Sequence, residues 1–453
     1  MKRKYKGFLA GLHKKKPLFV TLESSGLVLS PAGGGKTVSF VIPALAHNDM
    51  SMLVPDLKGT LACVTGRYRE KTLGHKIITL NPAGLYTDIL GPSARYNPLQ
   101  ILIDDWEDPA LRSQLFTDAG ALAKQLYPDP PEQGENQYWR SGSRKFLIFA
   151  FLYLVTIGGF ATLSGALCLL SETGALHSAL KEAAAAYHLG GDLARLARDL
   201  LAKFDSGDPR QIESFREGAV QALEVFAPSG TLAESTSMCD FRFADMKAQK
   251  LTIYLLADPT RMKVYAPWLG VLSWCALTEL IRAKGTNPAC FLCDEVTNFK
   301  IEGLPAMLTL VREFKIIIWL IVQELEQWAH VYGREALETL LSQTEVKIFM
   351  NARSHRTCRL ISDMLGEKSI KTSSYSFGGY FLDPISQSVQ ESPRKLMTPD
   401  EVRRCEDVIV FVRGLRPIRL TQIGYHEITP WKNKLAINPL FGKVFKAKTK
   451  AGV

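Results

Sequence analysis

The chain has 453 residues, of which 46% are hydrophobic and 22% are charged, close to the average of globular proteins. This composition excludes a wholly disordered chain and a collagen-like or coiled-coil fibre. The formal net charge is +10, but 13 Lys and Arg residues lie in two ends without acids, 1–16 and 432–453, which leaves −3 for residues 17–431. We interpret the ends as a basic N-terminal arm and a basic C-terminal tail, either solvated or in contact with phosphates of nucleic acid or lipid.

The first third of the chain alternates short apolar runs with helical patterns. The pattern predicts strands over 27–29, 52–55 and 77–80, with helices over 36–46 and 61–68 between them. A strand–helix–strand–helix–strand order is typical of a parallel sheet. We therefore expect residues 17–104 to form the first part of an α/β domain.

The strand signal then disappears, and Ala, Leu, Lys and Glu dominate residues 105–230, which predicts an all-alpha insertion. Residues 146–170 contain no charge and exceed the ~20 residues that span a bilayer. A membrane span is one interpretation, but Gly158 and Gly159 interrupt the run, which favours two buried helices joined by a turn. Residues 1–29 before the first helix contain no predicted membrane span.

Strand signals return in the second half and predict a second part of the α/β domain over 231–431. The predicted strands cover residues 251–256, 289–293, 316–322, 346–350 and 408–412. A stretch rich in Ser, Gly and Pro over 368–393 predicts a long surface loop or hairpin. The sequence thus predicts an α/β fold with a mainly parallel sheet, interrupted by an all-alpha domain.

A glycine-rich segment directly follows the first predicted strand and opens a helix. It reads Ser30-Pro31-Ala32-Gly33-Gly34-Gly35-Lys36-Thr37 and predicts a phosphate-binding loop rather than a structural turn. Backbone N–H groups of such a loop point at a polyphosphate, and the helix N-terminus adds its dipole. Lys36 would bridge the β- and γ-phosphates of ATP, and the Thr37 hydroxyl would bind Mg²⁺. The predicted nucleotide-binding residues are Ala32, Gly33, Gly34, Gly35, Lys36, Thr37 and Val38.

Carboxylates and polar groups end two later strands, where an NTPase needs them. Asp294 and Glu295 follow the apolar run 289–293, so Asp294 is the predicted second Mg²⁺ ligand and Glu295 the base that polarises the attacking water. Gln323 ends the next strand and is a predicted sensor of the γ-phosphate. Arg312 would reach the phosphate of a neighbouring subunit as an arginine finger, or is a solvated helix-end arginine.

The eight cysteines are scattered through a long chain, which favours a reducing cytosol. Cys290 and Cys293 alternate through an apolar run, so we expect two buried strand cysteines and not a zinc site. The sequence contains no GxSxG or HExxH motif and no GxGxxG after the first strand, so it lacks residues for a serine hydrolase, metallopeptidase or dehydrogenase.

In their order these motifs resemble those of the type IV secretion system coupling proteins, the TraG-type conjugative DNA transfer ATPases related to the FtsK and HerA motors. The resemblance extends over nearly the whole chain. The matching stretches are 30–43, 54–59 (Val-Pro-Asp-Leu-Lys-Gly), 95–99 (Arg-Tyr-Asn-Pro-Leu), 292–298, Gln323, 332–333, 361–366 and 396–401.

The resemblance implies a RecA-like nucleotide-binding domain that uses ATP and Mg²⁺ and assembles as a homo-hexamer. It also implies a place on the cytoplasmic side of the bacterial inner membrane, where the ring delivers a relaxase-bound DNA strand or a protein to the secretion channel. The family typically carries transmembrane helices before this domain, whereas the phosphate-binding loop begins here by residue 30.

Two other functions fit the same sequence. One is a receptor that binds nucleotide to stabilise its fold, does not hydrolyse it, and docks secretion substrates on the helical domain. The other is an FtsK- or HerA-like DNA translocase outside secretion. Glu295 and Arg312 favour a motor, because a receptor needs neither a base nor an arginine finger.

Overall fold

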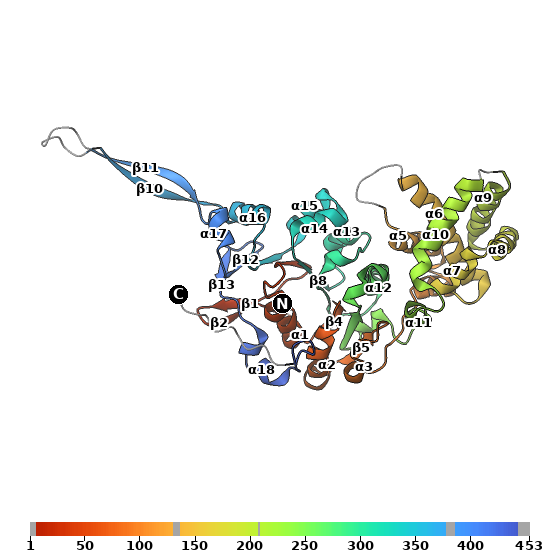
Figure 1. Cartoon of the computed structure of the whole chain (residues 1–453), viewed down its shortest axis with the longest axis horizontal. Helices are drawn as coiled ribbons and strands as arrows, with labels where there is room; N and C mark the ends of the chain where they lie inside the picture. Colours follow the sequence, from red (N-terminus) through yellow and green to blue (C-terminus); the bar gives the residue numbers. More distant parts are fainter. Residues whose placement is uncertain (1–5, 130–135, 207–208, 377–385, 443–453) are drawn as a thin grey trace.

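The computed structural model describes residues 6–129, 136–206, 209–376 and 386–442. In these ranges a nine-stranded sheet forms the centre, with a block of helices on one side and a long two-stranded ribbon on the other (Figure 1). In spatial order the strands are β13 (Ile418–Leu420), β12 (Val408–Val412), β9 (Val346–Phe349), β3 (Ser25–Leu29), β8 (Ile316–Val322), β7 (Ala289–Cys293), β4 (Ser51–Asp56), β6 (Leu251–Leu256) and β5 (Lys76–Leu80).

The sheet is mainly parallel, as predicted. Every neighbouring pair from β9 to β5 is parallel, whereas β12 runs antiparallel to both β9 and β13. β8 lies between β3 and β7, so the strand that precedes the glycine-rich segment and the strand that precedes Asp294 share a neighbour. The α/β fold class expected from the sequence is confirmed.

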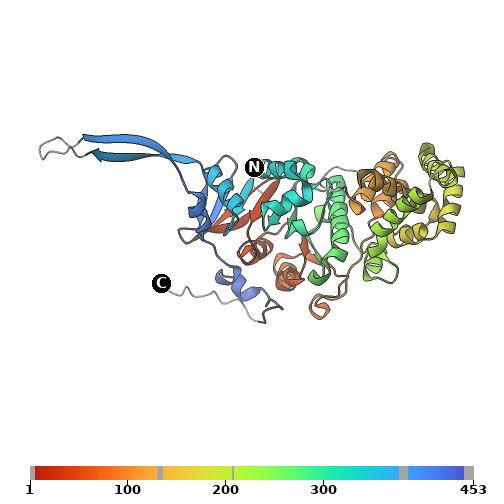
Figure 2. The same cartoon turned by 45° about the horizontal axis from the view of Figure 1, so that its top comes forward.

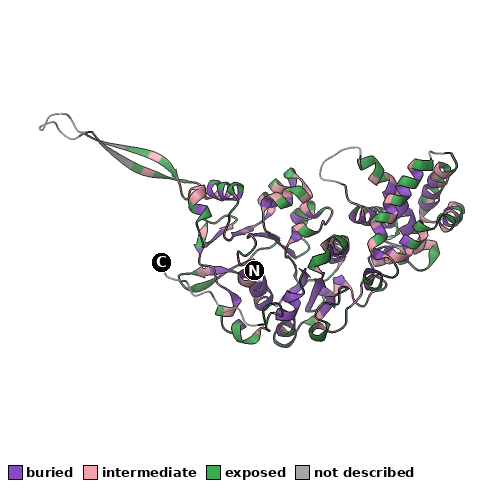
Figure 3. Ribbon diagram, viewed as in Figure 1, coloured by how far each residue is buried: buried purple, intermediate pink, exposed green. Residues whose placement is uncertain are grey.

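Alternation along the strands builds two hydrophobic faces. In β8, Trp319 and its neighbours Ile317 and Ile321 join one buried cluster, while the even-numbered positions 316–322 join the other. Because both faces are covered, the central strands are purple along their length in Figure 3 and have continuous apolar sequences. Cys290 and Cys293 are both fully buried in β7 and lie in different clusters, as predicted for buried strand cysteines.

Different helices cover the two faces. One face packs against α1 (Ile42–His47) and α2 (Thr60–Leu73). The other packs against α4 (Gln100–Glu107), α12 (Met262–Arg282) and α13 (Leu304–Leu310). Shorter or more peripheral helices are α3 (Thr87–Leu90), α11 (Thr231–Ser235), α14 (Leu325–Tyr332), α15 (Arg334–Gln343), α16 (His355–Leu365), α17 (Pro399–Arg403) and α18 (Trp431–Lys434).

The helical block extends from the side of the sheet where α12 lies, as Figures 1 and 2 both show. Its helices are α5 (Leu115–Leu126), α6 (Asn136–Tyr153), α7 (Leu163–Ser171), α8 (Thr173–Ala185), α9 (Asp192–Ser206) and α10 (Pro209–Leu223). The uncharged run 146–170 forms the end of α6, a π-helical turn over Leu154–Gly158 and α7, with the left-handed Gly159 between them. This is the predicted pair of helices joined at Gly158 and Gly159.

Two described helices are long and apolar enough to cross a membrane, Gln137–Gly158 and Pro259–Arg282. In the most apolar window of the first helix 39% of residues are buried within the protein, and in that of the second 72%. A buried core helix meets the same length and composition criterion.

Residues 8–20 differ from the expectation of a solvated basic arm over 1–16. Phe8–His13 forms strand β1, which pairs antiparallel with β2 (Lys16–Val20). Phe8 and Leu9 are fully buried, and Leu12 exchanges two backbone hydrogen bonds with Thr421 after β13. The apolar side chains of β1 outweigh the basic residues around it, so residues 8–20 form a hairpin and not a solvated arm. Residues 1–5 and 443–453 of the predicted basic ends lie outside the described ranges.

The stretch predicted as a loop or hairpin is a hairpin. β10 (Glu367–Ser376) and β11 (Ser386–Lys395) pair antiparallel in a ribbon that projects away from the sheet (Figure 1). The connection over 377–385 lies outside the described residues.

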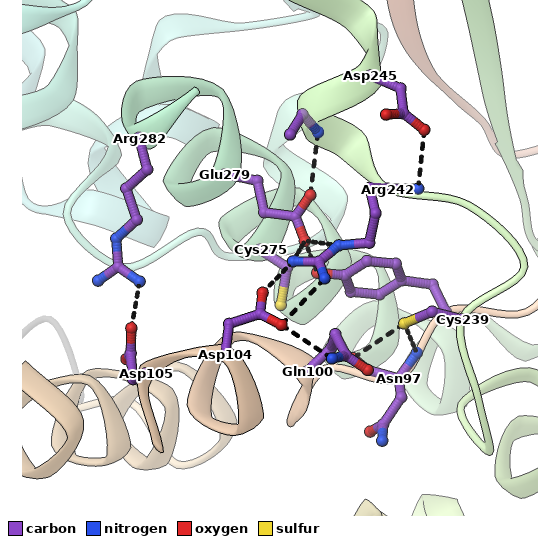
Figure 4. A network of polar contacts seen from close by, with 12 residues as sticks. Asn97, Gln100, Asp104, Asp105, Cys239, Arg242, Asp245, Cys275, Glu279 and Arg282 are labelled. Carbon is purple, nitrogen blue, oxygen red and sulfur yellow. Dashed lines mark hydrogen bonds and ion pairs between the residues drawn. The ribbon is translucent and has the colours of Figure 1, made fainter. Parts of the chain in front are cut away.

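A polar network joins α4 to α12, where the helical block meets the sheet (Figure 4). The Arg242 guanidinium donates to Asp104 of α4 and, from Nε, to Glu279 Oε1 of α12 at 3.0 Å. The Tyr96 hydroxyl donates to the same Glu279 oxygen at 2.6 Å. Arg282, one turn further along α12, binds Asp105 at 3.2 Å. The 95–99 stretch that the sequence singled out is therefore part of the junction between the two halves of the chain.

Candidate nucleotide-binding site

The glycine-rich segment forms a tight loop between β3 and the first helical turn. Gly33 and Gly35 have positive φ angles of 74° and 87°, and a Cβ at Gly35 would lie 2.2 Å from Gln422 Nε2. Gly34 N–H donates to the Pro31 carbonyl at 2.9 Å, and Ser39 N–H donates to the Gly35 carbonyl at 2.8 Å. The helix predicted over 36–46 starts as a π-helical turn over Thr37–Val41 and continues as α1.

Three strands bring the predicted catalytic groups to one edge of the sheet. Lys36 Nζ lies 3.3 Å from Glu295 Oε1 and 3.8 Å from Asp294 Oδ1. Gln323, at the end of β8, donates from Nε2 to the same Glu295 oxygen at 3.3 Å. The carboxyl ends of parallel strands are the usual place for ligands in α/β folds, because loops from neighbouring strands meet there.

Burial sets the electrostatics of the two carboxylates nearest Lys36. Loss of hydration raises the pKa of Asp294 to about 6, with the Lys36 charge acting in the opposite direction and Glu295 adding to the rise. Asp294 Oδ1 is buried and has no hydrogen-bond donor among the described residues. Glu295 adopts a left-handed backbone conformation, with φ of 56°, and Asn298 Nδ2 donates to its Oε2 at 2.9 Å. A buried, under-bonded carboxylate oxygen is an arrangement that a cation would complete.

A third carboxylate, Asp56 at the end of β4, lines the same cavity. Its side chain accepts a hydrogen bond from Ala62 N–H at 2.8 Å, and burial raises its pKa to about 7, with the nearby Asp294 adding to the rise. Asp56 was not among the predicted site residues. Its position at the end of an apolar strand, two residues before Lys58 and three before Gly59, is the signal that could have identified it.

Two distant side chains hold the loop backbone. Asn351 after β9 and Gln422 after β13 both donate to the carbonyl of Gly34, at 3.1 and 2.9 Å. Gln422 Nε2 also lies 3.2 Å from Ser39 Oγ, and Asn351 Nδ2 donates to Gln422 Oε1 at 3.0 Å. Sequence reasoning missed both residues, and no local motif marks them.

These groups surround a cavity of about 500 Å³. Of the predicted nucleotide-binding residues, all except Gly34 line it, and so do Asp294, Glu295 and Gln323. The cavity is further lined by Pro31, Ile42, Asp56, Leu57, Lys58, Thr60, Leu61, Tyr425, Asn438, Leu440 and Phe441.

Arg312 does not line the cavity. It follows α13, its side chain is 62% exposed, and its guanidinium pairs with Glu23. Within this chain it is therefore not brought to the Lys36 site, and its role as a finger toward a neighbouring subunit stays a prediction.

Comparison with known proteins gives three findings. A family profile described as "Type IV secretory system Conjugative DNA transfer" matches residues 2–449. Protein VirD4 of Rhizobium radiobacter is 25% identical over 414 residues, which cover 88% of this chain and 57% of that protein. Conjugal transfer protein TraG of Escherichia coli is 23% identical over 477 residues, with 95% and 72% coverage. The chain thus spans less than two thirds of the VirD4 length.

Solved structures share the fold. The unbound monoclinic form of the bacterial conjugative coupling protein TrwBdeltaN70 superposes with a TM-score of 0.66 at 15% identity and covers 91% of this chain and 88% of its own. The plasmid coupling protein TrwB in complex with ADP and Mg²⁺ has a TM-score of 0.62 at 15% identity, with 88% and 86% coverage. TrwB has also been solved with the non-hydrolysable ATP analogue ADPNP.

Proposed function

The chain belongs to the family of type IV secretory system conjugative DNA transfer proteins, and from this premise we propose that it is an ATP-driven coupling protein. It recruits a relaxase-bound single DNA strand, or a protein, and delivers it to the type IV secretion channel on the cytoplasmic side of the bacterial inner membrane. The observation that carries the proposal is the meeting of Lys36, Asp294, Glu295 and Gln323 at one cavity.

ATP and Mg²⁺ are the proposed cofactors. The buried Asp294 Oδ1, which lacks a hydrogen-bond donor, fits a hard cation, and carboxylate and hydroxyl oxygens are the ligands that Mg²⁺ prefers. We assign Thr37 and Asp294 as its ligands and the backbone of the glycine-rich loop as the phosphate cradle. Mg²⁺ supplies charge neutralisation of the transferred phosphoryl group when it is bound.

The residues of the chain then have separate roles in hydrolysis. Lys36 exchanges its contact with Glu295 for one with the phosphates, which frees the Glu295 carboxylate. Glu295 accepts a proton from the attacking water, a function worth typically 10²–10⁴-fold in rate. Gln323, now bonded to Glu295, orients that water and responds to the presence of the terminal phosphate.

In the proposed homo-hexameric ring, a neighbouring subunit supplies a further positive charge to the site. Arg312 is exposed, so a neighbouring copy can place it at the phosphates, where a positive charge stabilises the transition state. Single-stranded DNA held through its phosphates in such a ring would dissociate steeply with added salt. The basic segments before residue 8 and after residue 431 are proposed contacts to the membrane surface or to DNA.

The test is ATP hydrolysis by the purified chain with and without single-stranded DNA, next to Lys36→Ala. We expect turnover that DNA stimulates and that Lys36→Ala abolishes. Nucleotide binding without turnover in either condition would contradict the motor and support a receptor that does not hydrolyse ATP. DNA binding that is insensitive to salt would contradict the proposed phosphate contacts.

A further inference from the structure

The cavity lining has an apolar part besides its charged part. Asp294 and Glu295 lie next to Lys36, and Gln323 bonds to Glu295, whereas several other lining side chains are apolar. This apolar wall comes from the first turns after the glycine-rich loop, from α2 and from a C-terminal segment almost 400 positions away in the sequence. Its side chains are Val38, Ile42, Leu61, Tyr425, Leu440 and Phe441.

The distant segment packs against α1, which follows the glycine-rich loop, and against α2. Trp431 of α18 is 5% exposed and meets the His47 ring of α1 edge-on, with ring centres 5.8 Å apart. Ala436 N–H then donates to the Val64 carbonyl of α2 at 3.1 Å. In Figure 1, α18 lies beside α2, and Trp431 joins the buried cluster on the face of the sheet that α2 covers. The segment is therefore docked on α1 and α2 before it reaches the cavity.

A turn at Asn438 presents the last two lining side chains. Its side-chain oxygen accepts from Leu440 N–H at 3.0 Å, and its backbone carbonyl accepts from Phe441 N–H at 3.1 Å and Gly442 N–H at 3.2 Å. Leu440 is 54% and Phe441 57% exposed, whereas Tyr425 is 4% exposed. The cavity lining thus includes two large apolar side chains that are more than half exposed.

We propose that Tyr425, Leu440 and Phe441 form the base-binding wall of the nucleotide site. This inference rests on the proposed function, in which Lys36 and the loop bind the phosphates. The ribose and base of a nucleotide bound there extend beyond its phosphates, and the apolar wall is the part of the cavity lining that suits a base. Stacking on an aromatic ring suits a nucleobase, since every base has a π-face. The volume of about 500 Å³ lies in the range of small-ligand sites, roughly 300–1,000 Å³.

The test separates the base from the phosphates by using two ligands, ADP and inorganic tripolyphosphate, in calorimetry of the full chain. Phe441→Ala should weaken ADP binding by about tenfold, the lower range of what one stacked base contributes. Tripolyphosphate has no base, so its affinity should stay unchanged. Phe441→Trp, which keeps a stacking surface, should restore ADP binding.

Ile437→Ala is the matched control, because Ile437 is 54% exposed in the same segment but does not line the cavity. It should leave both ligands unaffected. Unchanged ADP affinity in Phe441→Ala overturns the inference, and so does an equal loss of both ligands. Tighter ADP binding would show that the segment competes with nucleotide, which overturns it as well. If the unaltered chain binds neither ligand, the proposed function fails instead.

Discussion

The carbonyl oxygen of Gly34 accepts hydrogen bonds from Asn351 and Gln422, which are 317 and 388 positions away in the sequence. The two amides bind one oxygen and each other, so the loop backbone is held from the β9 and β13 side as well as by its own turn. A phosphate cradle binds by its backbone N–H groups, and their directions depend on the peptide planes of the loop. We infer that Asn351 and Gln422 are positioning residues of the nucleotide site.

Gln422→Ala should therefore weaken ADP binding by about three- to tenfold, since misplacing the cradle loses about one hydrogen bond of roughly 1 kcal/mol. Tripolyphosphate should lose affinity to the same extent, unlike in the Phe441 variant. Calorimetry of both ligands measures this, with the exposed Gln221→Ala as control. ADP and tripolyphosphate affinities equal to those of the unaltered chain would show that the loop keeps its shape without Gln422.

Residue identity predicted one part of this site and not the other. Asp294, Glu295 and Gln323 follow strand ends, and Lys36 and Thr37 follow the loop after β3. Loops at the carboxyl ends of neighbouring parallel strands meet, so the nearness of these residues was predictable from the sequence. The base-binding wall and the side-chain amides of Asn351 and Gln422 reach the site only through tertiary packing. Their types occur at many surface positions, and nothing nearby in the sequence distinguishes them.

At the scale of elements, the fully buried Arg69 of α2 links this helix to β6 and to the connection after α1. It donates to carbonyls after α1 and to Thr252 of β6, whose hydroxyl lies 3.0 Å from His75 Nδ1. His75 Nε2 lies 3.2 Å from the Asp49 carbonyl. Burial, with Arg69 and Lys250 adding to it, lowers the pKa of His75 to about 3. The folded structure therefore requires His75 to be neutral.

The pH dependence of stability follows from that pKa. Below about pH 6.5 the unfolded chain binds a proton at His75 that the folded chain refuses, so stability falls as pH falls, by about 1.4 kcal/mol per unit. Between pH 7 and pH 5 this effect of His75 lowers the free energy of unfolding by about 2 kcal/mol. Urea unfolding at both pH values measures this. From pH 7 to pH 5, the free energy of unfolding of His75→Gln should fall by about 2 kcal/mol less than that of the unaltered chain. The exposed His13→Gln should behave like the unaltered chain, and an equal loss in His75→Gln would contradict the assignment.

Elements with buried apolar runs could be predicted, and those at the periphery could not. β8 is apolar at every position because both faces of the sheet are covered, so its sequence predicts it with the observed bounds. β1 is equally apolar in its first residues, but the basic residues around it are typical of a solvated arm. Its residue Leu12 pairs with Thr421, which lies 409 positions later in the chain. The spatial order of strands depends on such distant pairs, which local patterns do not encode.

At the scale of the whole molecule, the chain has a central sheet with the helical block and the ribbon on opposite sides (Figure 2). The change of composition after residue 105 predicts the helical block, because strand residues disappear there. The direction of the ribbon is not predictable, since β10 and β11 pair with no other strand among the described residues. The cavity is lined by every predicted catalytic side chain except Arg312, so the proposed arginine finger would come from a second copy.

The most direct test of a motor with shared sites is to mix two inactive variants, Glu295→Gln and Arg312→Ala, and measure ATP turnover. Each variant alone lacks one group of every site and should be inactive. In an equal random mixture, a copy with intact Glu295 meets a neighbour with intact Arg312 at about one interface in four, so about a quarter of the normal turnover should return. No recovery at any ratio, or full activity of Arg312→Ala alone, would contradict the account.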